Sequence, residues 1–326
     1  MSGPPRVSVV IPAYRSQATI GGCLEALARQ TAGGFETVVV DSSPDGATAE
    51  VVRRHPEARL ERSALRLLPH AARNRGVDLA RGDVLVFTDP DVYPRPDWLA
   101  TLLATHAETA GPVVGALGCY GARWLDLGIH LTKFANWLPD GRPGTVDNAP
   151  TANLLCSRAH FAAVGGFRDD LMAGDTLFSW RLALLAPIRF EPRAVVEHDH
   201  LCDLGGFFRE RFVRGVEFAG ARRAFHHHGR RRDLLFLAVS ALPVRLGRIL
   251  ARTARLCRRA RLGGAFLRTL PLIVAGHSCW LAGESLGYLR GLTAAGTPCD
   301  ILPPSPALAV PGEVPEPEHP ARSVSP

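Results

Sequence analysis

The stretch DVLVFTDPDVYPRPDWL, residues 83–99, joins an apolar run to two aspartates and then to a helix-like segment. The run VLVF predicts a buried strand, because consecutive apolar residues suit a strand that is covered on both faces. Asp89 and Asp91 follow at positions i and i+2, a spacing that turns both carboxylates to one side of an extended segment. Two interpretations are open: a proline-containing turn that caps a helix starting near Pro96, or a metal site.

The chain around this stretch alternates between strand-like and helix-like segments. Apolar runs predict strands at 6–14, 35–41 and 83–89. Helical periodicity predicts helices at 18–30, 48–56, 71–81 and 96–108. This alternation is typical of a mostly parallel sheet with helices on both faces, so we expect a Rossmann-like α/β fold.

Polar clusters follow the three predicted strands. They are PAYRS at 12–16, a loop of acidic, serine, proline and glycine residues at 41–46, and DPD at 89–91. Ligands of such sheets bind beyond the carboxyl ends of the strands, so we expect the three clusters to share one site.

The positive charge of the chain is concentrated in one segment. The net charge is +7 over 326 residues, yet residues 234–283 hold eight arginines and no Asp or Glu. The basicity is therefore local. The seven cysteines are scattered without a CxxC pair, which argues against a disulfide framework and a zinc ribbon. The opening MSGPPRVSVVIP shows no leader-like pattern, so we expect no signal peptide and a reducing compartment.

Four segments, in order, resemble the family 2 glycosyltransferases, which use nucleotide sugars and have the GT-A fold. They are VSVVIPAYRSQATIGGCLEALARQ, the strand ETVVVD with the loop and helix that follow it to residue 52, AARNRGVDLARGDVLVFTDPDV, and VGGFRDDLMAGDTLFSWRL. The resemblance covers roughly residues 6–220 and implies a GT-A catalytic domain.

The resemblance implies roles for several nucleotide-binding residues. Residues 12–14 (Pro12, Ala13 and Tyr14) would bracket the base, and Asp41 would recognise it, although the usual Asp doublet is here Asp41-Ser42. A turn-forming role for Asp41 is the alternative. Arg73 and Asn74 would contact the phosphates or the ribose.

The resemblance also implies a metal site. Asp91 would bind Mg²⁺ or Mn²⁺, which prefer hard oxygen ligands, while Asp89 would contact the ribose or the metal. His198 and His200 lie where related enzymes often carry a late metal or phosphate ligand, and a loop role for either histidine stays open.

Asp175 is the candidate catalytic base in GDTLFSWRL, where the family's Glu-Asp pair is replaced by Gly174-Asp175. A base must reach the acceptor hydroxyl opposite the departing nucleotide, and we expect burial to raise the pKa of this carboxyl. The alternative is a residue that caps the following helix.

The C-terminal arginines predict an amphipathic helix. Along residues 245–259 they recur every three to four positions with aliphatic residues beside them, a pattern that suits an anionic membrane surface on the cytoplasmic side. The apolar runs 234–244 and 269–283 are short for bilayer spans. We favour monotopic or re-entrant attachment over spanning helices or a soluble oligomerisation arm, and the aliphatic neighbours argue against nucleic-acid binding.

Three parts are expected: a GT-A catalytic domain at 1–205, membrane-associated helices at 206–296 and a proline-rich disordered tail at 297–326. The expected function is a membrane-associated, inverting glycosyltransferase. It would move a sugar, from a UDP-sugar by preference, to a lipid-linked or cell-surface glycan acceptor. A sugar nucleotidyltransferase and a catalytically inactive nucleotide-sugar-binding scaffold are the alternatives; the first would need a glycine-rich basic loop that PAYRSQATIGG lacks.

Overall fold

The computed structural model describes residues 7–170, 173–226, 229–241 and 243–293. The predicted tail at 297–326 lies outside these residues. A nine-stranded sheet forms the centre of the N-terminal part, with the path β3-β2-β1-β4-β8-β6-β9-β5 and β7 paired to β9. The strands are β1 (Val7–Ala13), β2 (Phe35–Asp41), β3 (Ala58–Arg62), β4 (Val84–Thr88), β5 (Val92–Pro94), β6 (Val113–Cys119), β7 (Gly144–Val146), β8 (Asn153–Ser157) and β9 (Ile188–His198).

The sheet is parallel in its first half and mixed in its second half. Strands β3, β2, β1 and β4 run parallel, whereas β8 runs antiparallel to both β4 and β6. Strand β9 runs parallel to β6 and antiparallel to β5 and β7. The prediction of a mostly parallel Rossmann-like sheet is confirmed, and the short strands β3, β5 and β7 were not predicted.

Helices cover both faces of the sheet, as the apolar strands predict. The helices of this part are α1 (Ile20–Ala28), α2 (Ala47–Arg53), α3 (Pro69–Leu79), α4 (Trp98–Thr109), α5 (Trp124–Phe134), the 3-10 helix η1 (Ala135–Trp137), α6 (Arg158–Val164) and α7 (Gly174–Leu185). Side chains of α1, α2 and α4 share one apolar core with the sheet, and side chains of α3, α6 and α7 share another. In β1, Val9 and Ile11 join the first core and Val10 joins the second, which is the alternation expected of a strand.

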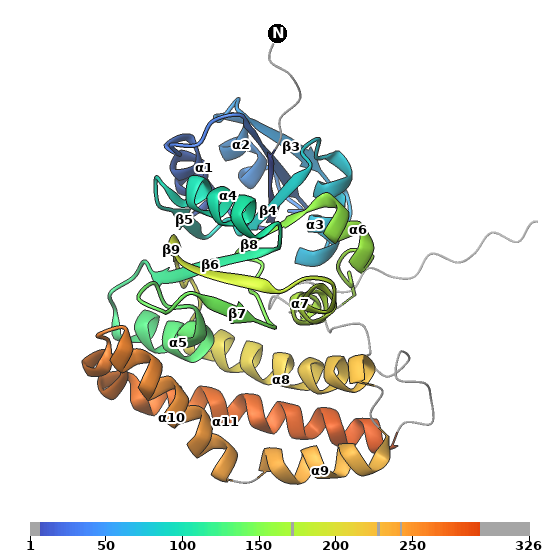
Figure 1. The fold of residues 1–326 in the computed structure, drawn as a ribbon, viewed down its shortest axis with the longest axis vertical. Coiled ribbons are helices and arrows are strands. Elements are labelled where there is room, and N and C mark those ends of the chain that lie inside the picture. The colour runs from blue at the N-terminus through green and yellow to red at the C-terminus, as the bar shows by residue number, and fades with distance from the viewer. Residues whose placement is uncertain (1–6, 171–172, 227–228, 242, 294–326) are drawn as a thin grey trace, which may run out of the picture.

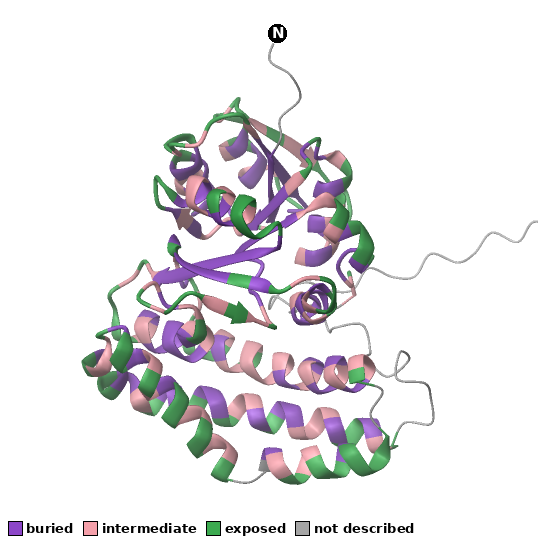
Figure 2. Cartoon of the chain, in the orientation of Figure 1, coloured by how far each residue is buried: buried purple, intermediate pink, exposed green. Residues whose placement is uncertain are grey.

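Four long helices form a separate layer below the sheet (Figure 1). They are α8 (Leu204–His226), α9 (Arg230–Ala241), α10 (Pro243–Arg259) and α11 (Gly263–Thr293). Helices α8 and α11 approach closely because Gly215 and Gly283 face the partner backbone, where a Cβ atom would collide with the carbonyl oxygens of Trp280 and Phe212. Figure 2 shows that the strands are mostly buried, whereas α9 and α10 carry much exposed surface.

A buried acid connects three helices of this layer. Glu284 of α11 is fully buried and pairs with Arg222 of α8 at 3.3 Å and with Arg245 of α10 at 2.7 Å. The hydroxyl of Tyr288 donates to the same carboxylate at 3.3 Å. Arg245 is therefore an internal ion-pair partner and not part of the exposed arginine face that the sequence predicts.

Within the described residues, α11 is the one unbroken helix that is long and apolar enough to cross a membrane by length and composition. Much of this helix is buried against α8, α9 and α5 inside the molecule. The helix continues well beyond the uncharged run at 269–283. Helix α8 begins at Leu204, beside the predicted boundary at 205, and the division into domains stays a prediction.

Candidate active site

A cavity of about 650 Å³ lies between the carboxyl edge of the sheet and the helical layer. Its walls come from the end of β1, the start of α3, the β4–β5 connection, η1, α7, and the helices α8, α10 and α11. The sequence-predicted residues that line it are Pro12, Ala13, Tyr14, Arg73, Asp89, Asp91, Asp175 and His198. Residues as far apart in the chain as Pro12 and Trp280 therefore meet at one site.

The two aspartates after β4 lie in this cavity. Asp89 pairs closely with the guanidinium of Arg73, which is itself buried. Asp91 lies next to β5, whose pairing with β9 places His198 opposite Val92. Burial raises the pKa of the Asp91 carboxyl, with help from Asp89, while the charges of His198 and Lys133 oppose the rise. Neither aspartate caps α4, because its N-cap residue is Asp97 and makes no side-chain cap bond.

His198 and His200 occupy different environments. The Nδ1 of His198 lies 2.9 Å from the Asp199 carbonyl oxygen, which can only accept, so Nδ1 donates, and Nε2 carries the lone pair when the ring is neutral. His198 lines the cavity. His200 instead faces His130, with 3.1 Å between its Nε2 and the His130 Nδ1. The structure thus brings only His198 to the predicted site, and its ring stacks on His200 at 4.6 Å between centroids.

The end of β1 forms one wall as predicted. The guanidinium of Arg66 lies over the Tyr14 ring, 4.4 Å from the ring centroid, and both residues line the cavity. A flat ring beside a flat cation can hold a nucleobase by stacking. Arg66 was not predicted, because it lies in a segment without a recognisable motif.

The side chain of Asp41 forms hydrogen bonds within its own loop. The side chain is fully buried, and its Oδ1 accepts from the Ser43 backbone N–H at 2.9 Å and from the Ser43 hydroxyl at 2.5 Å. Its Oδ2 lies 3.8 Å from Arg62 and has no hydrogen-bond partner within the described residues. The turn-forming interpretation describes this geometry, and Ser42 rather than Asp41 lines the cavity.

Of the adjacent residues Arg73 and Asn74, likewise only one lines the cavity. Arg73 lines the cavity between His70 and Asp89. Asn74 faces the loop before α7, where its amide donates to the Phe167 carbonyl at 2.9 Å and accepts from the Phe167 N–H at 3.0 Å. The expectation that Asn74 contacts the nucleotide is therefore not supported, because both ends of its amide are used by Phe167.

Asp175 stands in the first turn of α7 and faces the cavity. Its Oδ1 accepts from the Thr176 N–H at 2.8 Å and its Oδ2 lies 3.6 Å from Arg214, but it does not cap α7, whose N-cap residue is Ala173 without a side-chain cap bond. Burial alone would raise the pKa of this carboxyl, but the charges of Arg214, His70 and Arg73 outweigh burial and hold it below the ordinary value. The expectation of a raised pKa is wrong, because the surrounding cations were not visible in the local sequence.

Gly174 explains why no acid precedes Asp175. A Cβ atom at Gly174 would lie 2.6 Å from the Arg168 carbonyl oxygen and 2.7 Å from Cδ2 of His70. His70 occupies this space because its Nε2 accepts the Asp175 backbone N–H at 3.2 Å. An acidic side chain has no room at position 174, so Asp175 is the acid of this pair.

The helical layer supplies a wall that the sequence did not predict. Its members are the cations and aromatics Arg211, Arg214, Phe218, His277 and Trp280 of the helical layer, together with Lys133 of α5. Burial lowers the pKa of Arg211 to about 10, and burial together with Arg211 lowers the pKa of His277 to about 3. Within the described residues, Nε of Arg211 and Nε2 of His277 have no hydrogen-bond partner. Such buried polar atoms suit a polar ligand in this part of the cavity.

Comparison with known proteins gives consistent matches. Residues 8–162 match the model of glycosyl transferase family 2. The chain is 31% identical over 219 residues to the pre-mycofactocin glycosyltransferase of Mycobacterium tuberculosis strain H37Rv, covering 62% of this chain and 45% of the relative. It is 33% identical over 182 residues to glycosyltransferase AglE of Haloferax volcanii, covering 52% and 58%. The chain thus spans about half the length of these curated relatives.

A solved structure extends the likeness to the whole fold. The mannosyltransferase PcManGT of Pyrobaculum calidifontis, in complex with GDP-Man and Mn²⁺, matches with a TM-score of 0.59. The match covers 89% of this chain and 88% of that one at 24% identity. TarS of S. aureus matches with a TM-score of 0.51 and 18% identity. At these identities the likeness concerns the fold, including the helical layer beyond the family model.

Proposed function

We propose, from the match of residues 8–162 to the family 2 glycosyltransferases, that the chain transfers a sugar from a nucleoside-diphosphate sugar to an acceptor hydroxyl with inversion. One observation carries the proposal. A single cavity places the paired aspartates Asp89 and Asp91 on its sheet wall and an ionised acid, Asp175, on helix α7. A leaving diphosphate and a general base need separate positions of this kind.

The donor would bind along the sheet edge. Tyr14 and Arg66 offer a stacking slot for the base, and Ser42 lines the cavity beside them. Arg73 brings a buried positive charge toward the phosphates. We propose a UDP-sugar as donor, and a GDP-sugar is the alternative, since PcManGT was solved with GDP-Man.

The residues after β4 fit a divalent cation. Asp91 is half-buried, and within the described residues no side chain donates a hydrogen bond to it; the neutral ring of His198 would offer its Nε2 on the same wall. Carboxylate oxygens, with one imidazole, suit Mg²⁺ or Mn²⁺. When bound, the cation would offset the negative charge of the departing diphosphate. We propose Asp91 as its main ligand, because Asp89 already pairs with Arg73.

Asp175 would take the proton of the acceptor. As the acceptor oxygen bonds to the anomeric carbon, the bond from that carbon to the diphosphate oxygen breaks, and the hydroxyl proton moves to Oδ2 of Asp175. Oδ2 faces Arg214 and is the oxygen that does not accept from the α7 backbone, because Oδ1 accepts from Thr176. Arg214 keeps the carboxylate charged and ready to accept this proton.

The acceptor would enter from the helical layer. Lys133, Arg211 and Arg214 give this wall a positive character, and Phe218 and Trp280 give it flat apolar surface. An acceptor that combines an anionic group with an apolar or sugar face fits both properties, as a lipid-linked glycan does. A cell-surface glycan with acidic groups fits the cationic half alone.

The same layer would bring the site to an anionic membrane. Arginines of α10 at positions 248, 252 and 255 are exposed, and exposed leucines and a valine lie on the same layer: Leu234, Leu235, Val244 and Leu267. Exposed cations beside exposed aliphatic groups suit an anionic lipid surface. We propose peripheral attachment at the cytoplasmic face.

Two variants test the catalytic proposal. Asp91→Asn should abolish the stabilisation of the chain by donor plus Mn²⁺, whereas Asp175→Asn should keep that stabilisation and lower turnover by about 10²- to 10⁴-fold, the usual share of a general base. The measurements are thermal shifts with UDP-, GDP- and dTDP-sugars, and release of nucleoside diphosphate with Mn²⁺. Near-normal turnover by Asp175→Asn would reject the base. Release of pyrophosphate would favour a nucleotidyltransferase, and donor binding without turnover an inactive scaffold.

A further inference from the structure

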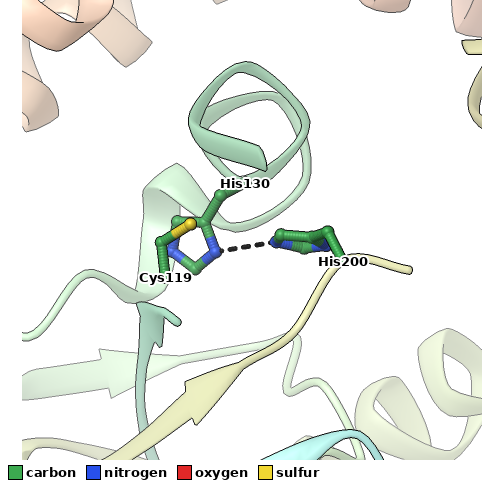
Figure 3. A group of neighbouring side chains, drawn as sticks. All are labelled: Cys119, His130 and His200. Atoms are coloured by element: carbon green, nitrogen blue, oxygen red, sulfur yellow. Dashed lines mark hydrogen bonds between the residues drawn. The ribbon is translucent and has the colours of Figure 1, made fainter. Parts of the chain in front are cut away.

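Three side chains with metal-binding atoms meet outside the cavity. Cys119 ends β6, His130 lies in α5, and His200 follows β9 (Figure 3). The Cys119 sulfur and one ring nitrogen of each histidine all lie within 4.8 Å of one another. The three residues are 11 and 70 positions apart along the chain, so no sequence spacing indicates the cluster.

The tautomer of His130 is set by the backbone. Its Nε2 lies 3.2 Å from the Leu117 carbonyl oxygen, which can only accept, so Nε2 donates and the lone pair belongs to Nδ1. This Nδ1 faces Nε2 of His200 at 3.1 Å. A ring that donates one N–H to a backbone carbonyl and presents its other nitrogen is the usual form of a metal-binding histidine.

The distances suit a small tetrahedral ion. Two nitrogens at ordinary zinc distances lie about 3.3 Å apart, and a nitrogen and a sulfur about 3.6 Å apart. The observed nitrogen separation is 3.1 Å, and the sulfur lies within the 4.8 Å limit. The Cys119 thiol donates to the Gly121 carbonyl oxygen at 3.1 Å.

The composition of the cluster selects the metal. One thiol and two imidazoles with no carboxylate are poor ligands for Mg²⁺ or Mn²⁺ and good ligands for Zn²⁺. His130 and His200 are buried, and Cys119 is half-buried, so an ion can enter from the Cys119 side. Binding would release the thiol proton to solvent.

We propose that Cys119, His130 and His200 bind one Zn²⁺ ion, with a fourth position left to solvent. The ion would tie the end of β6 to α5 and to the segment after β9. His200 stacks on His198 with 18° between the rings. By fixing the His200 ring, the ion would therefore also fix the position of His198, which lines the cavity. The site is distinct from the aspartates after β4 and does not rest on the proposed reaction.

Cobalt titration of the full chain tests the proposal. After treatment with a chelator, the wild-type chain should bind one Co²⁺ with a thiolate-to-cobalt absorption band, and Zn²⁺ should displace it. Cys119→Ser should lose the band, and both Cys119→Ser and His200→Gln should bind Zn²⁺ at least about 100-fold more weakly, since even loss of a ligand's partner costs 10- to 100-fold. Asp91→Asn should keep the band.

The matched controls are Cys279→Ser and His106→Gln. Cys279 is also half-buried and has its sulfur 3.3 Å from a backbone carbonyl, and His106 likewise contacts a carbonyl at 2.7 Å, but neither belongs to the cluster. Both variants should bind like wild type. A wild-type chain without a submicromolar Zn²⁺ site, or a Cys119→Ser chain with an unchanged band, would overturn the proposal.

A measurement on the wild-type chain tests the proposal even if the variants fail to fold. Alkylation of Cys119, followed by peptide mass spectrometry, should slow at least tenfold with one equivalent of Zn²⁺. Alkylation of Cys279 should keep its rate. Equal rates at Cys119 with and without Zn²⁺ would reject the site.

Discussion

The proton affinity of Asp175 depends on its cationic neighbours. Arg214 is the largest of the charges that lower the pKa of this carboxyl against the effect of burial. Replacing it leaves a buried carboxyl with less compensation, so its pKa should rise. A base must be deprotonated to act, and a higher pKa therefore moves the loss of activity to higher pH.

We predict that Arg214→Gln shifts the acidic limb of the kcat/KM profile upward by about one pH unit or more. Rates of donor turnover between pH 4 and 8 measure the shift. Arg211→Gln is the control, because Arg211 lines the same wall but is not among the main charges that lower the pKa of Asp175. An identical acidic limb in both variants would remove Arg214 from this role.

Gly174 gives a second residue-scale prediction. Gly174→Ala should lower the free energy of unfolding by about 1–3 kcal/mol, because its methyl group would press on the Arg168 carbonyl and on His70. The urea midpoint measures this effect. Gly247→Ala in α10 has open space at its Cβ position and should be neutral or slightly stabilising. Equal midpoints for the two variants would show that position 174 has room for a side chain.

The sequence motifs predicted most of the residues on the sheet side of the cavity, but they did not predict which way every side chain points. Asp89, Asp91 and Asp175 line the cavity as predicted. Asn74 and Asp41 do not line it, because the Asn74 amide bonds to a partner that a local pattern cannot reveal and Oδ1 of Asp41 bonds to Ser43, while Oδ2 of Asp41 has no hydrogen-bond partner within the described residues. Asn74 bonds to Phe167, 93 residues away, and Asp41 bonds within its own loop.

At the scale of elements, long apolar or periodic segments were predictable and short ones were not. The strands β1, β2 and β4 and the helix α4 appear within a few residues of their expected bounds. Strand β3 has the sequence ARLER, which lacks a buried face, and it forms because β2 pairs with its backbone. Strands β5 and β7 have three residues each and depend entirely on β9. Pairing partners distant in the chain decide such strands.

Helix α10 carries the prediction for membrane binding. Replacing Arg248, Arg252 and Arg255 together by Gln should weaken binding to phosphatidylserine vesicles about 100-fold, because each arginine contributes about 1 kcal/mol near an anionic surface. Cosedimentation at two salt concentrations measures this loss. The control replaces three exposed arginines of the catalytic part, Arg29, Arg53 and Arg54. A similar loss in the control would place the lipid-binding surface elsewhere.

At the scale of the whole molecule, Glu284 holds the helical layer together. Glu284→Ala would leave Arg222 and Arg245 without their shared acid, and we predict a loss of about 3–5 kcal/mol in the free energy of unfolding. Denaturant titration followed by circular dichroism measures the loss. Glu25→Ala removes an exposed pair with Arg29 at 3.8 Å and should change stability by less than about 0.5 kcal/mol. A small effect at Glu284 would show that apolar packing alone secures the layer.

The cavity is lined by residues from inside and from outside the segment that matches the family. Asp89 and Asp91 lie within residues 8–162, whereas Asp175, Arg211 and Trp280 lie beyond them. The family match therefore covers the residues proposed to bind the donor, and it does not cover the residues proposed to bind the acceptor. Chains that share the matched segment and differ in the helices beyond it would share the proposed donor residues and differ in the proposed acceptor wall. The residues that would select the proposed acceptor therefore lie in the C-terminal part of the chain, and a chimera exchanged near residue 162 is expected to change acceptor while keeping donor.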